Sequence, residues 1–144
     1  MTKYPVGYSM LVLAILFLMT TGVVEAYEES LDYAQVRRVV ARETSSGVWR
    51  FDVTVRHDDT GWDHYADEWQ VIDAETGDVL GTRELAHPHV DEQPFTRSRS
   101  GIEIPSDTSV VVVRAKCNVH GFGGREIEVD LTRASGEGYE VTRR

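Results

Sequence analysis

The sequence predicts an all-β fold, an immunoglobulin-like antiparallel β-sandwich of about seven strands. Two patterns predict this fold. Apolar and polar residues alternate along many short segments, as in strands that bury one face, and turn-forming residues separate these segments at intervals of about 8 to 12 residues. The length of 144 residues also suits one hydrophobic core better than two. A small β-barrel is the alternative fold.

The N-terminal segment has the features of a secretory signal peptide. Lys3 is the only charged residue ahead of an apolar run over residues 11–19, and Ala26 is a small residue at a suitable cleavage position. We therefore expect residues 1–26 to be a signal peptide. Residues 27–144 would then be one domain, exported to a periplasmic or extracellular location, with no stable membrane span after cleavage. An uncleaved anchor is the alternative, because the uncharged stretch approaches the roughly 20 residues that a span needs.

The strands are predicted in order along this domain. Residues 27–40 are the one part that could hold a short helix. The strand over 48–57 places Trp49 and Phe51 on one face and polar residues on the other. Alternating or continuous apolar runs, bounded by turn residues, predict the remaining strands. Together the patterns predict strands over residues 48–57, 67–74, 79–86, 94–103, 109–117 and 125–132.

The composition limits the partners of such a domain. Asp and Glu number 24 against 15 Lys and Arg, so the formal net charge is −9. Nucleic-acid binding requires a basic surface, and no nucleic-acid partner is expected. A single cysteine excludes an internal disulfide and any zinc motif built on paired cysteines. An acidic run lacks the spacing of an EF-hand calcium site, and we expect a solvated loop there. Its members are Asp58, Asp59, Asp63 and Asp67.

The directions of consecutive antiparallel strands place the histidines. Successive connections lie at alternate ends of the sandwich, which groups residues 58–66, 87–93 and 118–124 at one end. The five histidines and the only cysteine belong to this end. Two of these residues, His57 and Cys117, also continue the inward-facing rows of their strands. The six potential ligands are His57, His64, His87, His89, His120 and Cys117.

Imidazole and thiolate groups gathered at one end predict a metal site. Together they favour a transition metal such as iron, copper or zinc over calcium or magnesium. Each residue also has a purely structural interpretation. Cys117 could be a small buried hydrophobic residue, and the pair His87 and His89 could belong to a solvated loop. The convergence of six donors on the same end favours the metal site.

The segment C-N-V-H-G, which begins at Cys117, resembles the C-N-x-H-G motif of superoxide reductases, the family of desulfoferrodoxin and neelaredoxin. Upstream, His57 and His64, with Trp69 after them, are similar to that family's pair of loop histidines and the tryptophan that follows. The match runs over roughly residues 48–124. The resemblance implies an immunoglobulin-like fold and one non-haem iron. In that family four equatorial histidines and an axial cysteine thiolate hold the iron, and the sixth position is open to superoxide.

By this resemblance, Cys117 is the axial thiolate, and three of the equatorial ligands are His57, His64 and His120. The implied activity is the one-electron reduction of superoxide to peroxide. A small redox protein or molecule would donate the electron. In that family the thiolate donates electron density to the iron from the side opposite the open position, which favours this reduction and the release of peroxide.

The chain departs from the family in three respects. The family's first histidine, in an upstream E-K-H loop, has no counterpart, because no histidine precedes His57. The loop lysine that attracts superoxide is also absent, since Lys116 is the only lysine after the signal segment and its position faces away. His57 and His64 are one residue further apart than the family's pair. We infer from the residues, and not from the family, that His87 or His89 replaces the missing ligand.

Three functions are compatible with the sequence. The first is an exported mononuclear iron protein, which is a superoxide-reductase-like enzyme if its metal site is intact. The second is a copper or zinc binding or carrier protein on the same fold, built on His87, His89 and His120. Cys117 can join that ligand set. The third is a metal-free secreted binding module whose acidic surface keeps it soluble.

Overall fold

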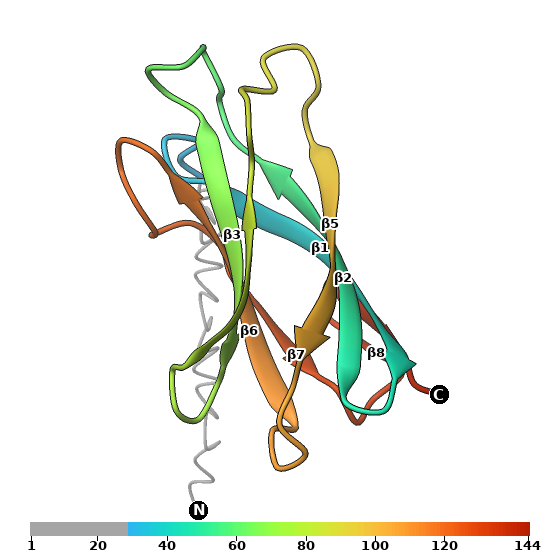
Figure 1. Cartoon of the computed structure of the whole chain (residues 1–144). Helices are drawn as coiled ribbons and strands as arrows, with labels where there is room; N and C mark the ends of the chain where they lie inside the picture. Colours follow the sequence, from blue (N-terminus) through green and yellow to red (C-terminus); the bar gives the residue numbers. More distant parts are fainter. Residues whose placement is uncertain (1–28) are drawn as a thin grey trace, which may run out of the picture.

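Two β-sheets packed face to face make up the protein, whose computed structural model describes residues 29–144 (Figure 1). These residues form strands and no helix, so no helix among them could cross a membrane. The predicted β-sandwich is therefore confirmed, while the signal peptide expected over residues 1–26 lies outside the described residues. The strands are β1 (Gln35–Ser45), β2 (Val48–Arg56), β3 (Ala66–Asp73), β4 (Val79–Glu84), β5 (Phe95–Glu103), β6 (Val110–Cys117), β7 (Ile127–Asp130), β8 (Ser135–Gly136) and β9 (Tyr139–Thr142).

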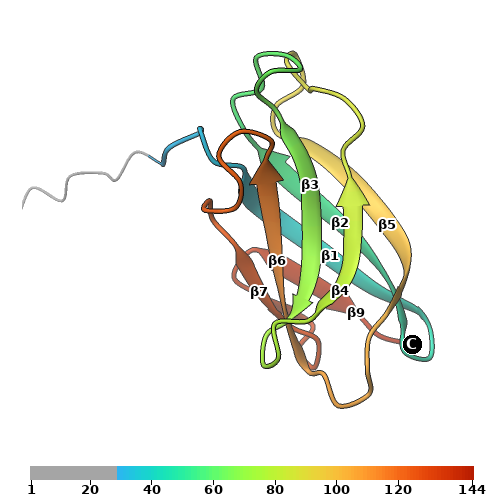
Figure 2. The same cartoon turned by 60° about the vertical axis from the view of Figure 1, so that its left-hand side comes forward.

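The strands divide into a five-stranded and a four-stranded sheet. The first has the order β5-β2-β1-β9-β8, and the second has the order β4-β3-β6-β7. Neighbouring strands are antiparallel, except that β1 and β9 run parallel. The chain crosses between the sheets after β2, β4, β5 and β7, and Figure 2 shows the two layers that these crossings join.

The core lies between the sheets and is built from alternate residues of the long strands. β2 buries every second residue from Trp49 to Val55, and β6 buries every second residue from Val111 to Cys117. Burying one such valine or phenylalanine side chain contributes about 1.5–3 kcal/mol to folding. The last residue of this inward row in β6 is Cys117, so its thiol lies inside the sandwich at one end.

Strand β1 contradicts the short helix expected over residues 27–40. Val36 and Val39 are both fully buried although they are three positions apart. A register shift between Val36 and Arg38 interrupts the pairing of β1 with β2 and makes this possible. Because of this irregularity, two successive buried residues are three positions apart and not two. In a sequence, apolar residues three positions apart suggest a helix and not a strand.

Two C-terminal strands bring the number to nine, against about seven predicted. β8 has two residues and β9 has four, which is too short for alternation to be recognised in the sequence. Tyr139 and Val141 of β9 are nevertheless buried, and β9 pairs with β1 inside the five-stranded sheet. Tertiary contacts therefore hold a segment whose own pattern is weak.

Three connections lie at the same end of the sandwich, which we call the loop end (the upper end in Figure 1). They are residues 57–65 after β2, residues 85–94 after β4 and residues 118–126 after β6. The opposite end carries the tight turns after β1 and β3 and the connection from β5 to β6. All five histidines belong to the loop end, as the alternation of strand directions predicts.

Candidate metal centre

Three side chains at the loop end bring donor atoms within reach of one ion. His57, His64 and Cys117 each offer one ligand atom, and these atoms all lie within 4.8 Å of one another. His57 follows directly on β2, and Cys117 is the last residue of β6. Ala66 pairs with Cys117 across the β3–β6 ladder, and His64 lies just ahead of Ala66 in the chain. The register of this ladder therefore brings the His64 loop to the thiol.

His120 adds a fourth donor through a tight turn. The backbones of Cys117 and Gly121 exchange two hydrogen bonds, of 3.0 and 2.8 Å, which fold the chain back on itself. Gly121 has a φ of 73°, a left-handed conformation that glycine adopts without strain. The turn places His120 Nδ1 3.6 Å from Cys117 Sγ and 3.3 Å from His64 Nε2. The spacing of cysteine, histidine and glycine in C-N-V-H-G is therefore the spacing that this turn requires.

Two of the distances among these donors, both of them to His120, fit bonds to a single transition-metal ion. Bonds of about 2.1 Å to nitrogen and about 2.3 Å to sulfur, at tetrahedral angles, separate two nitrogens by about 3.4 Å and a nitrogen from a sulfur by about 3.6 Å. The His64–His120 and Cys117–His120 separations are 3.3 and 3.6 Å. Imidazole and thiolate are also ligands that zinc, iron and copper accept. The donor set is thus suited to such an ion.

A buried carboxylate orients His57. The side chains of His57 and Asp59 are both fully buried, and His57 Nδ1 lies 2.6 Å from Asp59 Oδ1. Because an ionised carboxylate can only accept, Nδ1 carries the proton and donates it. Nε2 is then the His57 atom that a metal would take, in place of its 3.2 Å contact with the Asp32 carbonyl oxygen. A carboxylate behind a ligating histidine is a common arrangement in metal sites, where it sets the tautomer and the ring orientation.

The hydrogen bonds of Asp59 keep it ionised. Burial by itself would raise the pKa of this carboxyl, but the hydrogen bond from the His57 ring and those from the backbone amides of His89 and Ala66 outweigh burial and hold the pKa below its usual value. The two amides lie 2.7 and 3.0 Å from the carboxylate oxygens. Asp59 therefore joins three segments of the loop end while it holds His57.

Asp59 is the functional residue that sequence reasoning missed. The expected solvated acidic loop is wrong at this position, since the Asp59 side chain is fully buried whereas Asp58 is exposed. The physical reason is that three donors satisfy its charge inside the protein. A signal was present in the sequence, because Asp59 extends by one more step the inward row that leads through Val55 and His57.

The other two ligand candidates are held by backbone contacts. His64 Nδ1 lies 3.1 Å from the Asp58 carbonyl oxygen, so Nδ1 donates to it and leaves Nε2 toward His120. The Cys117 sulfur accepts a hydrogen bond from the Val119 amide at 3.4 Å. The thiolate is the form of a cysteine side chain that binds metal.

The centre is buried on one side and open on the other. His57 and Cys117 are each 1% exposed, whereas His120 is exposed. Trp62 and Val119, among the most exposed large apolar side chains of the described residues, lie in the same two loops. The edge of the centre at His120 is therefore in contact with solvent.

His87 and His89, the predicted replacement ligands, occupy a different part of the loop end. His89 is buried and stacks on Phe95, with ring centroids 3.8 Å apart and planes at 7°. Its Nδ1 lies 3.9 Å from Asp59 Oδ2, on the side of the carboxylate away from His57. Neither residue belongs to the group of donors that lie within 4.8 Å of one another. That either one replaces the missing ligand stays a prediction.

Lys116 lies on the outer face of β6, away from the centre. Its ammonium is 3.6 Å from Asp67 and 3.8 Å from Glu68, both on the neighbouring strand β3. Cys117, the next residue, faces the core. The lysine therefore supplies no positive charge to the centre, as its position in the strand predicts.

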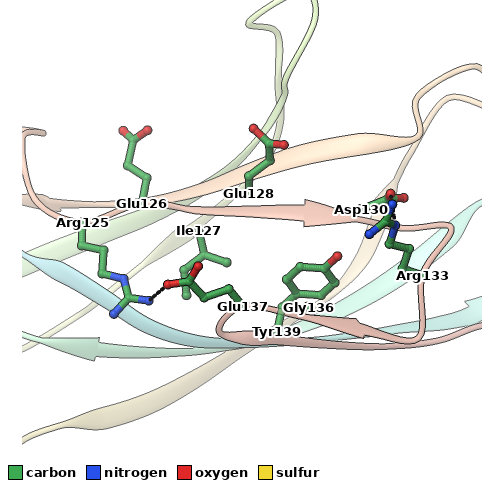
Figure 3. A pocket seen from close by; sticks show the side chains of 9 residues that line it. All are labelled: Arg125, Glu126, Ile127, Glu128, Asp130, Arg133, Gly136, Glu137 and Tyr139. Atoms are coloured by element: carbon green, nitrogen blue, oxygen red, sulfur yellow. Dashed lines mark ion pairs between the residues drawn. The ribbon is translucent and has the colours of Figure 1, made fainter.

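A cavity of about 530 Å³ lies elsewhere, between β7 and the hairpin formed by β8 and β9 (Figure 3). Charged residues of both signs line it, including Arg125 and Glu137, which form an ion pair of 3.9 Å. No histidine or cysteine is among its lining residues. Its chemistry points to a solvated groove and not to a reaction site.

No family model matches the chain. A protein of Halomicrobium mukohataei named "Putative lipoprotein" is 44% identical over 120 residues, which are 81% of this chain and 58% of that relative. The chain thus spans somewhat more than half the length of the relative it matches.

Two solved structures, both of superoxide reductases, are distantly similar in shape. The enzyme from Giardia intestinalis is 18% identical, with a TM-score of 0.40 over 67% of this chain and 99% of its own. A variant of the Archaeoglobus fulgidus enzyme (neelaredoxin), in the reduced form, is 16% identical, with a TM-score of 0.38 over 67% of this chain and 83% of its own.

Proposed function

We propose that the protein binds one transition-metal ion at the loop end, through His57, His64, Cys117 and His120. One observation carries the proposal: donor atoms from three separate segments converge, three of them within 4.8 Å and the fourth 3.3–3.6 Å from two of these residues. Asp59 supports it, because a fully buried carboxylate that fixes one His57 nitrogen has the role expected beside a ligating histidine.

We propose further that the ion is iron and that the protein reduces superoxide. The C-N-V-H-G motif and its upstream histidines, with the thiolate and imidazoles they supply, support this assignment. Bound iron would supply one-electron chemistry, in which superoxide gains one electron and two protons and leaves as hydrogen peroxide.

This chain's own residues would prepare that chemistry. Asp59 holds the proton of His57 at Nδ1, and the Asp58 carbonyl holds that of His64 at Nδ1. Both rings therefore present Nε2. The exposed side near His120 would admit the small anion and the protons that it takes up from solvent. The exposed apolar side chains of Trp62 and Val119 would offer a contact to a small redox donor of the electron.

A specific observation favours zinc as a second candidate. The separations of His120 from His64 and Cys117, 3.3 and 3.6 Å, match a nitrogen–nitrogen and a nitrogen–sulfur distance of tetrahedral coordination at bonds of about 2.1 and 2.3 Å, and closed tetrahedral sites with such ligands hold zinc. Four donors also meet here, one fewer than the family set of four histidines and a thiolate. In this case the ion would be structural.

We also propose that the protein is exported. The apolar segment near the N-terminus supports this, and so does the name of the Halomicrobium mukohataei relative.

The test is metal analysis and spectroscopy of the full chain. We expect about one equivalent of Fe(II) to bind, and the oxidised protein to show a visible thiolate-to-iron charge-transfer band that is lost in Cys117→Ser. Superoxide generated by a radiolysis pulse should then yield one hydrogen peroxide for each superoxide. Ser109→Ala, at the opposite end, is the matched control. Zinc bound with no visible band would favour the second candidate, and no bound metal would favour a metal-free binding module.

A further inference from the structure

We propose that His87 and His89 form a second metal site, for a divalent ion that prefers imidazole ligands, Zn²⁺ or Cu²⁺. This site is separate from the centre at Cys117 and does not depend on it. Four observations support the site: the unsatisfied ring of His89, its fixed position, the adjoining ring of His87, and the charges around the pair.

The His89 ring is buried without hydrogen-bond partners. The residue is 4% exposed, its side chain is 3% exposed, and neither ring nitrogen has a partner among the described residues. A neutral imidazole has one N–H to donate and one lone pair to offer, and burying both without a partner is unfavourable. Such an orphaned group in a folded protein calls for a partner, and a metal ion is one that accepts the lone pair.

The ring is nevertheless held firmly in place. It stacks on Phe95 at a centroid distance of 3.8 Å with the planes nearly parallel, at 7°. The backbone amide of His89 donates to Asp59 Oδ2 at 2.7 Å, and the Gln93 amide nitrogen donates to the His89 carbonyl at 3.1 Å. Apolar contact and backbone bonds therefore fix the residue, and its ring nitrogens remain free for a ligand.

His87 supplies a second imidazole next to the first. The two ring centroids are 4.6 Å apart, and the planes are tilted by 38°. His87 Nδ1 lies 3.0 Å from the Pro88 carbonyl oxygen, so it donates there and leaves Nε2 with a free lone pair. His87 is exposed, which gives an ion a route to the buried partner. Pro88 between them restricts the backbone and limits the entropy lost on binding.

The charges around the pair suit a cation. The carboxylates of Asp59 and Glu92 lie near the two rings, and Asp59 Oδ2 is 3.9 Å from His89 Nδ1. The Arg97 guanidinium lies 3.1 and 3.5 Å from the two Glu92 carboxylate oxygens, which offsets its charge.

Zinc titration of the metal-free full chain tests the proposal. By calorimetry we expect two equivalents of Zn²⁺ for the unmodified protein and one for His87→Ala, an exposed position whose substitution should not affect folding. His120→Ala should also bind one equivalent, through His87 and His89. Val90→Ala, an exposed neighbour in the same loop, is the control and should bind two. Nitrogen NMR should show Zn²⁺ shifting the ring nitrogens of His87 and His89 in the His120→Ala protein.

The outcomes separate this site from the proposed function. Loss of one equivalent in His87→Ala, with no loss in His120→Ala, would support the second site and contradict the centre at Cys117. One equivalent in the unmodified protein that His87→Ala leaves in place would overturn the second site. Ring nitrogens of His87 and His89 that do not shift with Zn²⁺ would also overturn it.

Discussion

Each end of the sandwich contains a largely buried aspartate, and the two ends use it differently. At the opposite end, Asp73 accepts hydrogen bonds from the backbone amides of Glu75 and Thr76, at 2.8 and 3.0 Å. The Thr108 hydroxyl also donates to it, at 2.6 Å. These bonds close the turn after β3 and tie it to the connection before β6. At the loop end, Asp59 takes the ring of His57 as one of its three donors.

The difference shows how one chemical group serves stability or function according to its partners. The partners of Asp73 are backbone amides and hydroxyls, which have nothing further to bind. The partner of Asp59 is an imidazole whose other nitrogen remains available near a thiol and two more histidines. Changes at the loop end should therefore alter metal binding, and equivalent changes at the opposite end should alter stability alone.

The largest expected effect is stabilisation by the metal. An ion that binds only the folded chain adds about 4 kcal/mol to the free energy of unfolding when its free concentration is 1,000 times its Kd. We expect denaturant unfolding with and without a chelator to differ by this order. His120→Ala should reduce the difference to what the site at His87 and His89 contributes, and Thr108→Val should retain it in full. The same chelator effect in both variants would contradict a centre that includes His120.

The second effect is the loss of metal affinity in Asp59→Asn. The amide leaves the shape of the side chain almost unchanged but no longer offers two accepting oxygens. Removal of a group that orients a ligating histidine lowers metal affinity by about 10–100-fold. We expect this loss in a competition titration against a chromophoric chelator, and none in Asp73→Asn, the matched change at the opposite end. Equal affinities for the two variants would show that Asp59 only supports the fold.

A pair of glycines tests the turn that carries His120. Gly121 and Gly77 have φ values of 73° and 76°, and in neither case would an added Cβ meet another atom within 4 Å. Alanine at either position should cost about 1–2 kcal/mol of stability through backbone strain alone. Only Gly121→Ala should also weaken metal binding, because its turn positions His120. If Gly77→Ala weakened binding as much, the loss would reflect general destabilisation.

The smallest expected effect is on how steeply the free energy of unfolding falls at acid pH. The Thr108 hydroxyl, with the amides of Thr76 and Glu75, lowers the pKa of Asp73 in the folded protein below its unfolded value of about 3.9. The ionised form is thus favoured by folding, so the stabilisation is complete above that unfolded pKa and is lost as the pH falls through the folded pKa. Urea unfolding as a function of pH should show a shallower acid limb in Asp73→Asn, with or without metal. An unchanged slope would mean that Asp73 titrates alike in both states.

Most of the fold could be predicted from the local pattern of apolar and polar residues, and the strands that this pattern misses have local causes. β2 and β6 have uninterrupted alternation and were predicted within a few residues. β1 was missed because the irregularity after Val36 changes the spacing of buried residues, and β9 because it is only four residues long. The grouping of the histidines followed from strand direction, which depends on the order of the strands and not on their contacts.

The pattern of apolar, polar and turn residues is sufficient to predict a β-sandwich with imidazoles and a thiol at one end. The reason is that successive side chains of a strand point to opposite faces, so a residue's position in the strand gives its direction. Folding in three dimensions was needed to separate the two sets of histidines. Asp59 forms hydrogen bonds with His57, in its own connection, and with His89, in the connection after β4. The His89 ring in turn stacks on Phe95 at the start of β5. Hydrogen bonds and stacking join atoms that are far apart in the chain, and so no local pattern records which nitrogen each histidine presents.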